Sequence, residues 1–189
     1  MCPHTSAMSE LKAGTAVLHQ RLEKRLRISE RFGERARYID HLERIAAFHV
    51  SAEEQWAAFL RPVLSDFPSR CKSALLLQDL AHLGGTVRGP AAVTRVDNSA
   101  AALGAFYVLE GSTLGGRHLS ALVERTLGLD ARSGASYLVS YGAAVPAMWE
   151  TFGAEVNAYC RDAAAVAHAV TAARKTFAAL EHWLCEAAA

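Results

Sequence analysis

The sequence predicts an all-α fold, and three observations support this prediction. Apolar residues recur at helical spacing along most of the 189 residues. Residues that favour helix ends flank these segments: Asn98, Ser99 and Asp162 suit helix starts, and Gly128 suits a helix end. No segment of alternating apolar and polar residues pairs convincingly with another, so no sheet is expected. About six to eight helices are expected in one layered α domain.

The first half of the chain contains three expected helices. The first is centred on residues 11–26, and the second runs from Glu34 to Leu60. A shorter helix is expected at residues 69–83, stopped by Gly84 and Gly85. Residues 85–97 include Pro90 and several β-branched residues and are expected to form a loop.

The second half continues the helical pattern. A single long helix is expected from Asn98 or Ser99 to about Leu127, followed by a loop at residues 130–134. Residues 136–141 are ambiguous between strand and helix. Pro146 opens a helix to about Cys160, and Asp162 caps the last one.

Length and composition indicate one domain, with residues 1–8 as a flexible N-terminus and residues 9–189 as the folded part. The net charge of +1 leaves no electrostatic footprint for nucleic acid. No stretch resembles a signal peptide or a membrane span, so a cytoplasmic protein without a membrane is expected. The four cysteines form neither a zinc motif nor a disulfide framework. A basic cluster ends the first helix and is a solvated face or a dock for an acidic protein: Arg21, Lys24, Arg25, Arg27 and Arg31.

His19 is the most informative residue of the first helix. It lies on the flank of an apolar stripe, together with Lys12 and Glu23. A histidine there either binds a metal, with Glu23 holding its second ring nitrogen, or is a core-edge histidine that Glu23 satisfies. Lys12 lies about 10 Å before it along the helix axis, at a rise of 1.5 Å per residue. This distance suits a flat ligand whose centre meets His19 and whose edge carries a carboxylate for Lys12.

A second unusual segment contains Gly111, Gly115 and Gly116 inside the expected long helix. Three glycines cost a helix interior about 3 kcal/mol relative to alanine. Gly111 and Gly115 share one face. Such a face serves either close helix packing or a flat ligand lying against the backbone, with Ser112 and Thr113 supplying hydroxyls or freed carbonyls for water.

Together the two segments resemble the heme oxygenase (haem oxygenase) family. The family's proximal helix has the pattern Leu-Lys-x-x-Thr-x-x-x-His-x-x-x-Glu, and its distal helix has Gly-x-x-x-Gly-Gly. The first pattern is matched from Leu11 to Glu23 and the second from Gly111 to Gly116. Residues 72–75 with 78–81, and 174–177, also resemble the family, and residues 106–116 look most like the bacterial branch often paired with bacteriophytochromes.

The resemblance implies a single-domain multi-helix fold with haem between the proximal and distal helices. His19 would be the axial iron ligand, with Glu23 orienting it and Lys12 pairing with a propionate. The distal glycines would lie over haem, with Gly111, Ser112 and Gly115 as the catalytic set. The remaining haem-binding residues would be Thr15, Tyr107, Gly116 and Phe177. Ser112 stands where mammalian members have an aspartate, which leaves the proton route open, and Arg117 and Arg161 are guesses for a second propionate partner.

The implied function is cleavage of haem, which is both substrate and cofactor, to biliverdin, carbon monoxide and iron. Lys12 with Tyr107 resembles the arrangement that gives the α isomer. No flavin or nicotinamide motif is present, so electrons would come from a ferredoxin or flavodoxin with its reductase. A bacteriophytochrome is a candidate acceptor of biliverdin.

Three other functions remain open from the sequence. The first is a catalytically silent haem sensor or carrier on the same fold, which the absent aspartate suggests. The second is a di-iron oxidase, for which only Asp79-x-x-His82 has suitable spacing. The third is a helical interaction module without a cofactor. The other histidines show no ligand spacing, and Trp56, Trp149 and Trp183 are expected in the core.

Overall fold

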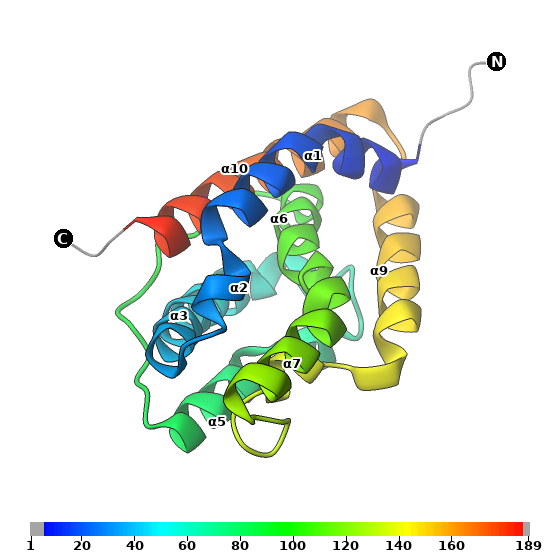
Figure 1. The fold of residues 1–189 in the computed structure, drawn as a ribbon. Helices are drawn as coiled ribbons and strands as arrows, with labels where there is room; N and C mark the ends of the chain where they lie inside the picture. Colours follow the sequence, from blue (N-terminus) through cyan, green and yellow to red (C-terminus); the bar gives the residue numbers. More distant parts are fainter. Residues whose placement is uncertain (1–5, 187–189) are drawn as a thin grey trace.

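The computed structural model describes residues 6–186 and shows the expected all-α fold (Figure 1). Within these residues the longer helices are α1 (Ala7–Leu26), α3 (Arg35–Leu60), α5 (Ser73–Leu83), α6 (Ser99–Gly111), α7 (Thr113–Leu127), α9 (Val145–Tyr159) and α10 (Ala163–Cys185). One-turn helices are α2 (Ile28–Arg31), α4 (Phe67–Arg70) and α8 (Ser136–Val139), and Gly142–Ala144 is a 3-10 turn. α1 begins at Ala7, two residues before the expected domain start, and residues 1–5 of the expected flexible N-terminus lie outside the described part.

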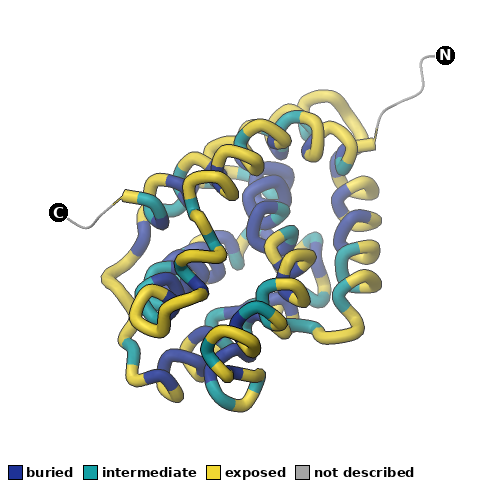
Figure 2. The backbone as a smooth tube through the Cα atoms, in the orientation of Figure 1, coloured by how far each residue is buried: buried dark blue, intermediate teal, exposed yellow. Residues whose placement is uncertain are grey.

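Helix α6 forms the centre of the fold because it is apolar on nearly all sides. Figure 2 shows it buried within the surrounding helices. Its closest neighbour is α10, and a Cβ on Gly104 would lie 1.9 Å from the Ala169 carbonyl oxygen. The two backbones can approach this closely only because residue 104 has no side chain. Helix α1 packs along the other side of α10, and α3 and α5 close the opposite side of the core.

The structure confirms the expected capping residues. The Asn98 side chain accepts the Ala101 N–H at 2.8 Å, and the Asp162 side chain accepts the Ala165 N–H at 2.8 Å. Gly128 ends α7 with a φ of 68°, which glycine adopts without strain. These local signals account for the start of α6 and α10 and the end of α7.

The expected helix at residues 69–83 is instead two helices, and a long-range contact explains the break. The Glu53 carboxylate of α3 accepts the backbone N–H of Lys72 at 2.7 Å and of Ser73 at 3.1 Å. It therefore caps α5 from another helix, so α4 ends at Arg70 and α5 begins at Ser73.

The expected single helix at residues 98–127 is broken at Ser112. The Ser112 hydroxyl donates to the Leu109 carbonyl at 2.6 Å, and the Thr113 hydroxyl donates to the Glu110 carbonyl at 2.7 Å. Hydroxyls that bind helix carbonyls in this way bend or interrupt a helix. The ambiguous segment 136–141 contains α8, whose first N–H groups are bound by a buried aspartate described below.

Candidate functional site

The site is a cavity of about 830 Å³ between α1 and the junction of α6 and α7. Parts of α3, α8, α9 and α10 complete its walls. Its size lies within the range of small-molecule and cofactor pockets, and its lining is mostly apolar. Every residue of the expected haem site lines it: Lys12, Thr15, His19, Glu23, Tyr107, Gly111, Ser112, Gly115, Gly116 and Phe177.

Helix α1 forms the proximal wall, and its apolar stripe is seated as expected. Leu11, Thr15 and Leu22 are buried, and Gly14 lets α1 approach α10, since a Cβ there would lie 2.7 Å from Val170 Cγ1. The Thr15 hydroxyl donates to the Leu11 carbonyl at 2.7 Å. This packing fixes which face of α1 points to the core and which flank lines the cavity.

His19 stands on that flank and is not a core residue. Its side chain is 57% exposed, and Nδ1 lies 3.5 Å from Glu23 Oε2. The ring meets Phe177 edge-on, with centroids 5.9 Å apart. These contacts orient the ring from two sides while it lines the cavity. An imidazole nitrogen in this setting is suited to bind a haem iron.

The three glycines of the distal wall have different surroundings. A Cβ on Gly115 would meet nothing within 4 Å, whereas one on Gly116 would lie 2.3 Å from the Leu138 carbonyl oxygen. A Cβ on Gly111 would touch Trp149 at 3.6 Å. Gly115 therefore leaves open backbone beside the cavity, and Gly116 is required for packing of α7 on α8. Close helix packing therefore explains Gly116, whereas the open backbone at Gly115 leaves space for a ligand.

A buried ionic cluster supports the distal wall from behind. Glu110, the residue before Gly111, pairs with Arg70 and accepts the Tyr141 hydroxyl at 3.0 Å. Arg70 also donates to the Met148 carbonyl at 3.0 Å, which connects α4 to α9. Burial raises the pKa of Glu110, although Arg70 opposes this. These contacts hold the end of α6 next to the cavity.

Lys72 completes the cluster. Its ammonium donates to the Arg70 carbonyl at 2.7 Å and lies over the Tyr141 ring, 3.6 Å from the centroid. Burial lowers the pKa of Lys72 to about 8. The Lys72 side chain therefore contacts the groups behind the distal wall and does not line the cavity.

Asp79 has a structural task that its spacing to His82 did not indicate. Its carboxylate accepts the backbone N–H groups of Ser136 and Tyr137, both at 2.8 Å, and so anchors α8. His82 is exposed and its Nδ1 lies 2.9 Å from the Gln78 carbonyl. Asp79 of the motif considered for a di-iron site is therefore used to anchor α8. Residues 6–186 contain no group of three or more His, Cys, Asp or Glu side chains that could hold a metal ion.

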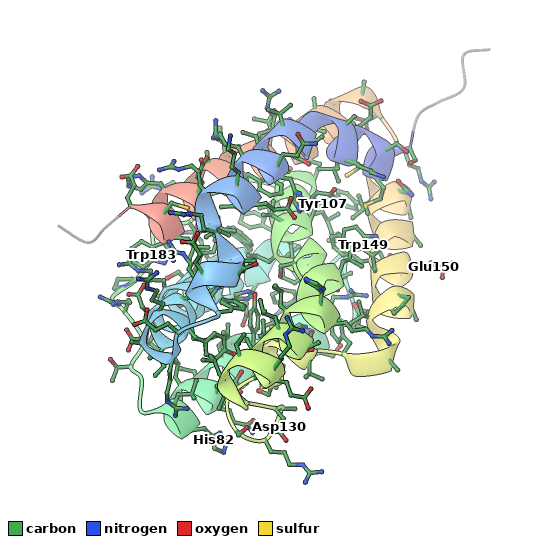
Figure 3. All side chains as sticks on the ribbon, viewed as in Figure 1. His82, Tyr107, Asp130, Trp149, Glu150 and Trp183 are labelled. Carbon is green, nitrogen blue, oxygen red and sulfur yellow. The ribbon has the colours of Figure 1, made fainter. Side chains whose placement is uncertain are left out.

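The cavity also contains residues that the sequence interpretation missed. Trp149, expected in the core, lines the cavity and stands 5.5 Å from the Tyr107 ring (Figure 3). Trp56 is buried as expected, and Trp183 is half-buried. Glu150 points outward from α9 in Figure 3. Arg117 and Arg161, considered as propionate partners, do not line the cavity.

His41 and Tyr137 are two further cavity residues that the sequence interpretation missed. His41 lies on α3, is 6% exposed, and its Nδ1 has no hydrogen-bond partner among the described residues. Burial, with a contribution from Arg31, lowers its pKa to about 3. The signal was available in part, because His41 shares the buried stripe of α3 with Leu42 and Ile45. Tyr137 lies on a one-turn helix that no periodicity predicts.

The sequence matches the family model described as heme oxygenase over residues 5–186. A search of curated proteins gives no significant match.

Solved structures with the same fold include three bacterial proteins. The NO- and CO-bound heme oxygenase of Neisseria meningitidis is 24% identical, with a TM-score of 0.85 over 95% of this chain and 90% of that one. The heme oxygenase of Leptospira interrogans is 18% identical, with a TM-score of 0.78 over 96% and 99%. Heme oxygenase-1 of Synechocystis sp. PCC6803, in complex with heme, is 20% identical, with a TM-score of 0.74 over 95% and 91%.

Proposed function

Because the chain belongs to the heme oxygenase family, we propose that it cleaves haem to biliverdin, carbon monoxide and iron, using dioxygen and external electrons. One observation carries this proposal: a cavity of about 830 Å³ has an oriented histidine on one wall and open glycine backbone on the other. The donor set fits haem, since the cavity combines an imidazole, a lysine and apolar walls. When bound, haem supplies both the dioxygen-binding iron and the ring to be cleaved.

The proximal residues bind and orient haem in this proposal. His19 would hold the iron, and Glu23, 3.5 Å from Nδ1, fixes the ring orientation. Lys12 pairs with a propionate at the cavity edge. Phe177 restricts rotation of His19 through their edge-on contact.

The distal residues shape the space over the haem face. Gly115 leaves room for haem to lie close to the backbone, while Gly111 and Gly116 set the position of the helices beside it. Tyr107 on α6 and Thr15 on α1 line the cavity from its two walls, and burial raises the pKa of Tyr107. With Lys12 they set the rotation of haem, and we expect mainly the α isomer of biliverdin.

Haem titration followed by a single turnover tests the proposal. The protein is loaded with one equivalent of haem, ascorbate is added in air, and the products are separated by chromatography. Loss of the Soret band with formation of α-biliverdin is expected. A persistent Soret band without biliverdin would overturn the proposal in favour of a haem sensor or carrier, and mainly β or δ isomers would overturn the predicted haem rotation.

We further propose that a ferredoxin or flavodoxin supplies the electrons in the cytoplasm and that a bacteriophytochrome accepts the product. The basic residues at the end of α1 support the first part. Glu181 offsets some of their charge, since Arg21 and Arg25 bind it, the latter at 3.0 Å. Within residues 6–186, none of the helices combines the length and the apolar character needed to cross a membrane.

A further inference from the structure

The cavity continues past His19 to an apolar inner end. On α1 the residues that line it run from Lys12 through His19 to Leu26. At a rise of 1.5 Å per residue, Lys12 and Leu26 each lie about 10 Å from His19 along the helix axis, in opposite directions. Together with Leu26, side chains from α2, α3 and α10 form the inner end: Ile28, Phe32, His41, Ile45 and Leu184.

His41 is the polar residue of the inner end, and the protein does not satisfy its imidazole. The residue is 6% exposed, and its Nδ1 has no hydrogen-bond partner within residues 6–186. Burial lowers the pKa of His41 to about 3, so at neutral pH the ring has one N–H donor and one acceptor nitrogen. Buried polar groups are nearly always hydrogen-bonded, so the unpaired imidazole indicates that a ligand completes its hydrogen bonding.

Packing holds the imidazole in place without a hydrogen bond. The Phe32 ring meets His41 edge-on, with centroids 5.1 Å apart and an interplanar angle of 68°. Phe32 in turn meets Tyr38, also with centroids 5.1 Å apart, and the Tyr38 hydroxyl donates to the Gly134 carbonyl at 2.9 Å. The position of the ring is therefore fixed, and its polar atoms are left for a ligand.

The charged groups next to the inner end are already paired. Arg31 donates to the Leu184 carbonyl at 2.8 Å. The Asp40 carboxylate accepts hydrogen bonds from Arg44 and Arg88. Neither Arg31 nor Asp40 lines this cavity. A ligand that reaches the inner end therefore meets apolar side chains and one neutral imidazole.

Cleavage of haem would change the edge that faces the inner end. Both propionates of haem are on one edge, which Lys12 binds in the proposed function. The opposite edge carries the α bridge between methyl and vinyl substituents, so it suits the apolar side chains but offers His41 no hydrogen bond. Loss of the α bridge as carbon monoxide leaves an oxygen on each of the two carbons that flanked it. Biliverdin therefore carries two lactam groups where haem is apolar.

We propose that His41 binds the product α-biliverdin through a hydrogen bond to one of these lactam groups. This inference rests on the proposed function, because the lactams face the inner end only when Lys12 holds the propionates at the other end. A lactam has a carbonyl acceptor and an N–H donor, which match the donor and the acceptor of a neutral imidazole. His41 thus distinguishes product from substrate by the groups that the reaction adds.

The experiment measures binding to the haem-free protein and requires no turnover. His41→Leu keeps a side chain of similar size but removes both nitrogens. The variant should bind α-biliverdin about tenfold more weakly than the wild type, near the upper range for one hydrogen bond. Its affinities for haem and for β-biliverdin, whose lactams are on a different edge, should each stay within about twofold. His82→Leu, which changes an exposed histidine on α5, is the matched control and should leave all three affinities unchanged.

A second measurement uses the wild type and does not depend on how the variant folds. In nitrogen NMR of the haem-free protein, the ring signals of His41 should shift when α-biliverdin is added. Unchanged affinity of His41→Leu for α-biliverdin, equal losses for the α and β isomers, or His41 signals that stay in place would each overturn the inference. Wild-type protein that binds haem without cleaving it would overturn the proposed function instead, and the titrations would still decide whether His41 binds biliverdin.

Discussion

The proximal and distal walls face the same cavity but are built in different ways. α1 is an uninterrupted helix, and His19 and Glu23 stand exposed on its flank. The distal wall is a helix broken at Ser112, supported from behind by the buried Arg70–Glu110 pair. The proximal wall therefore depends on one helical surface, whereas the distal wall depends on contacts among several distant segments.

This difference predicts how each wall responds to substitution. A substitution on the flank of α1 should change haem binding and leave the fold intact, because few other protein groups contact those side chains. A change behind the distal wall alters the shape of the cavity and the stability together, because the same atoms provide both.

Removing His19 should have the largest effect and should show the separation most clearly. Changes to groups around a metal ligand already cost about 10–100-fold, so His19→Ala should reduce haem turnover by more than about 100-fold. The melting temperature should shift by less than about 2 °C, because exposed substitutions stay within about 0.5 kcal/mol. Soret titration, single-turnover rates and thermal melts measure the three quantities. Added imidazole should restore the spectrum, and an unchanged Soret band in His19→Ala would contradict the assignment.

His41 lines the same cavity as His19 but is buried, so it should govern acid stability. Its folded-state pKa of about 3 lies below the ordinary 6.5, so the unfolded chain binds more protons between these values. Stability from this group is complete above pH 6.5 and is lost as the pH falls toward 3. At pH 4.5 the loss should reach about 3 kcal/mol, at 1.36 kcal/mol per pH unit.

Denaturant unfolding at pH 7 and pH 4.5 measures this loss. His41→Leu should lose less stability between the two pH values than the wild type does, whereas His82→Leu, which changes an exposed histidine, should match the wild type. Parallel acid sensitivity in His41→Leu and the wild type would show that other groups set the pH dependence.

The sequence predicts the residues of the proximal wall better than those of the distal wall, because the first follow from one regular helix. The helical period of α1 places Lys12, His19 and Glu23 on one flank of the helix, and all three line the cavity. Tyr137 could not be found, because its place depends on Asp79, 58 residues earlier in the chain. The break at Ser112 was missed as well, because the helical period continues on both sides of it and local hydroxyl bonds decide it.

The adjacent residues Gly115 and Gly116 separate cavity shape from packing within the distal wall itself. Gly116→Ala should destabilise the protein by about 1–3 kcal/mol, because its Cβ would overlap the Leu138 carbonyl, 2.3 Å away. Gly115→Ala should stabilise the haem-free protein by up to about 1 kcal/mol through helix propensity. The new methyl would nevertheless enter the cavity and weaken haem binding several-fold. Denaturant unfolding and haem titration of both variants check this, and equal stability of the two would contradict the assigned packing role of Gly116.

The smallest effect is expected on the outer face of α1, where Lys24→Glu tests donor docking. Arg21 and Arg25 are poor choices for charge reversal, because both bind Glu181, which is 4% exposed, and reversal would leave that carboxylate without its partners. Lys24 is exposed, so its reversal changes surface charge without this cost.

Turnover of Lys24→Glu with reduced ferredoxin should fall several-fold at low salt and recover as salt is added, because exposed charges act mainly on association. Turnover with ascorbate should not change, and Arg132→Glu, in the exposed turn before α8, should leave both rates unaltered. An equal ferredoxin-dependent turnover rate for Lys24→Glu and wild type would show that the donor docks elsewhere. Only the cavity-facing side of α1 would then have a role in turnover.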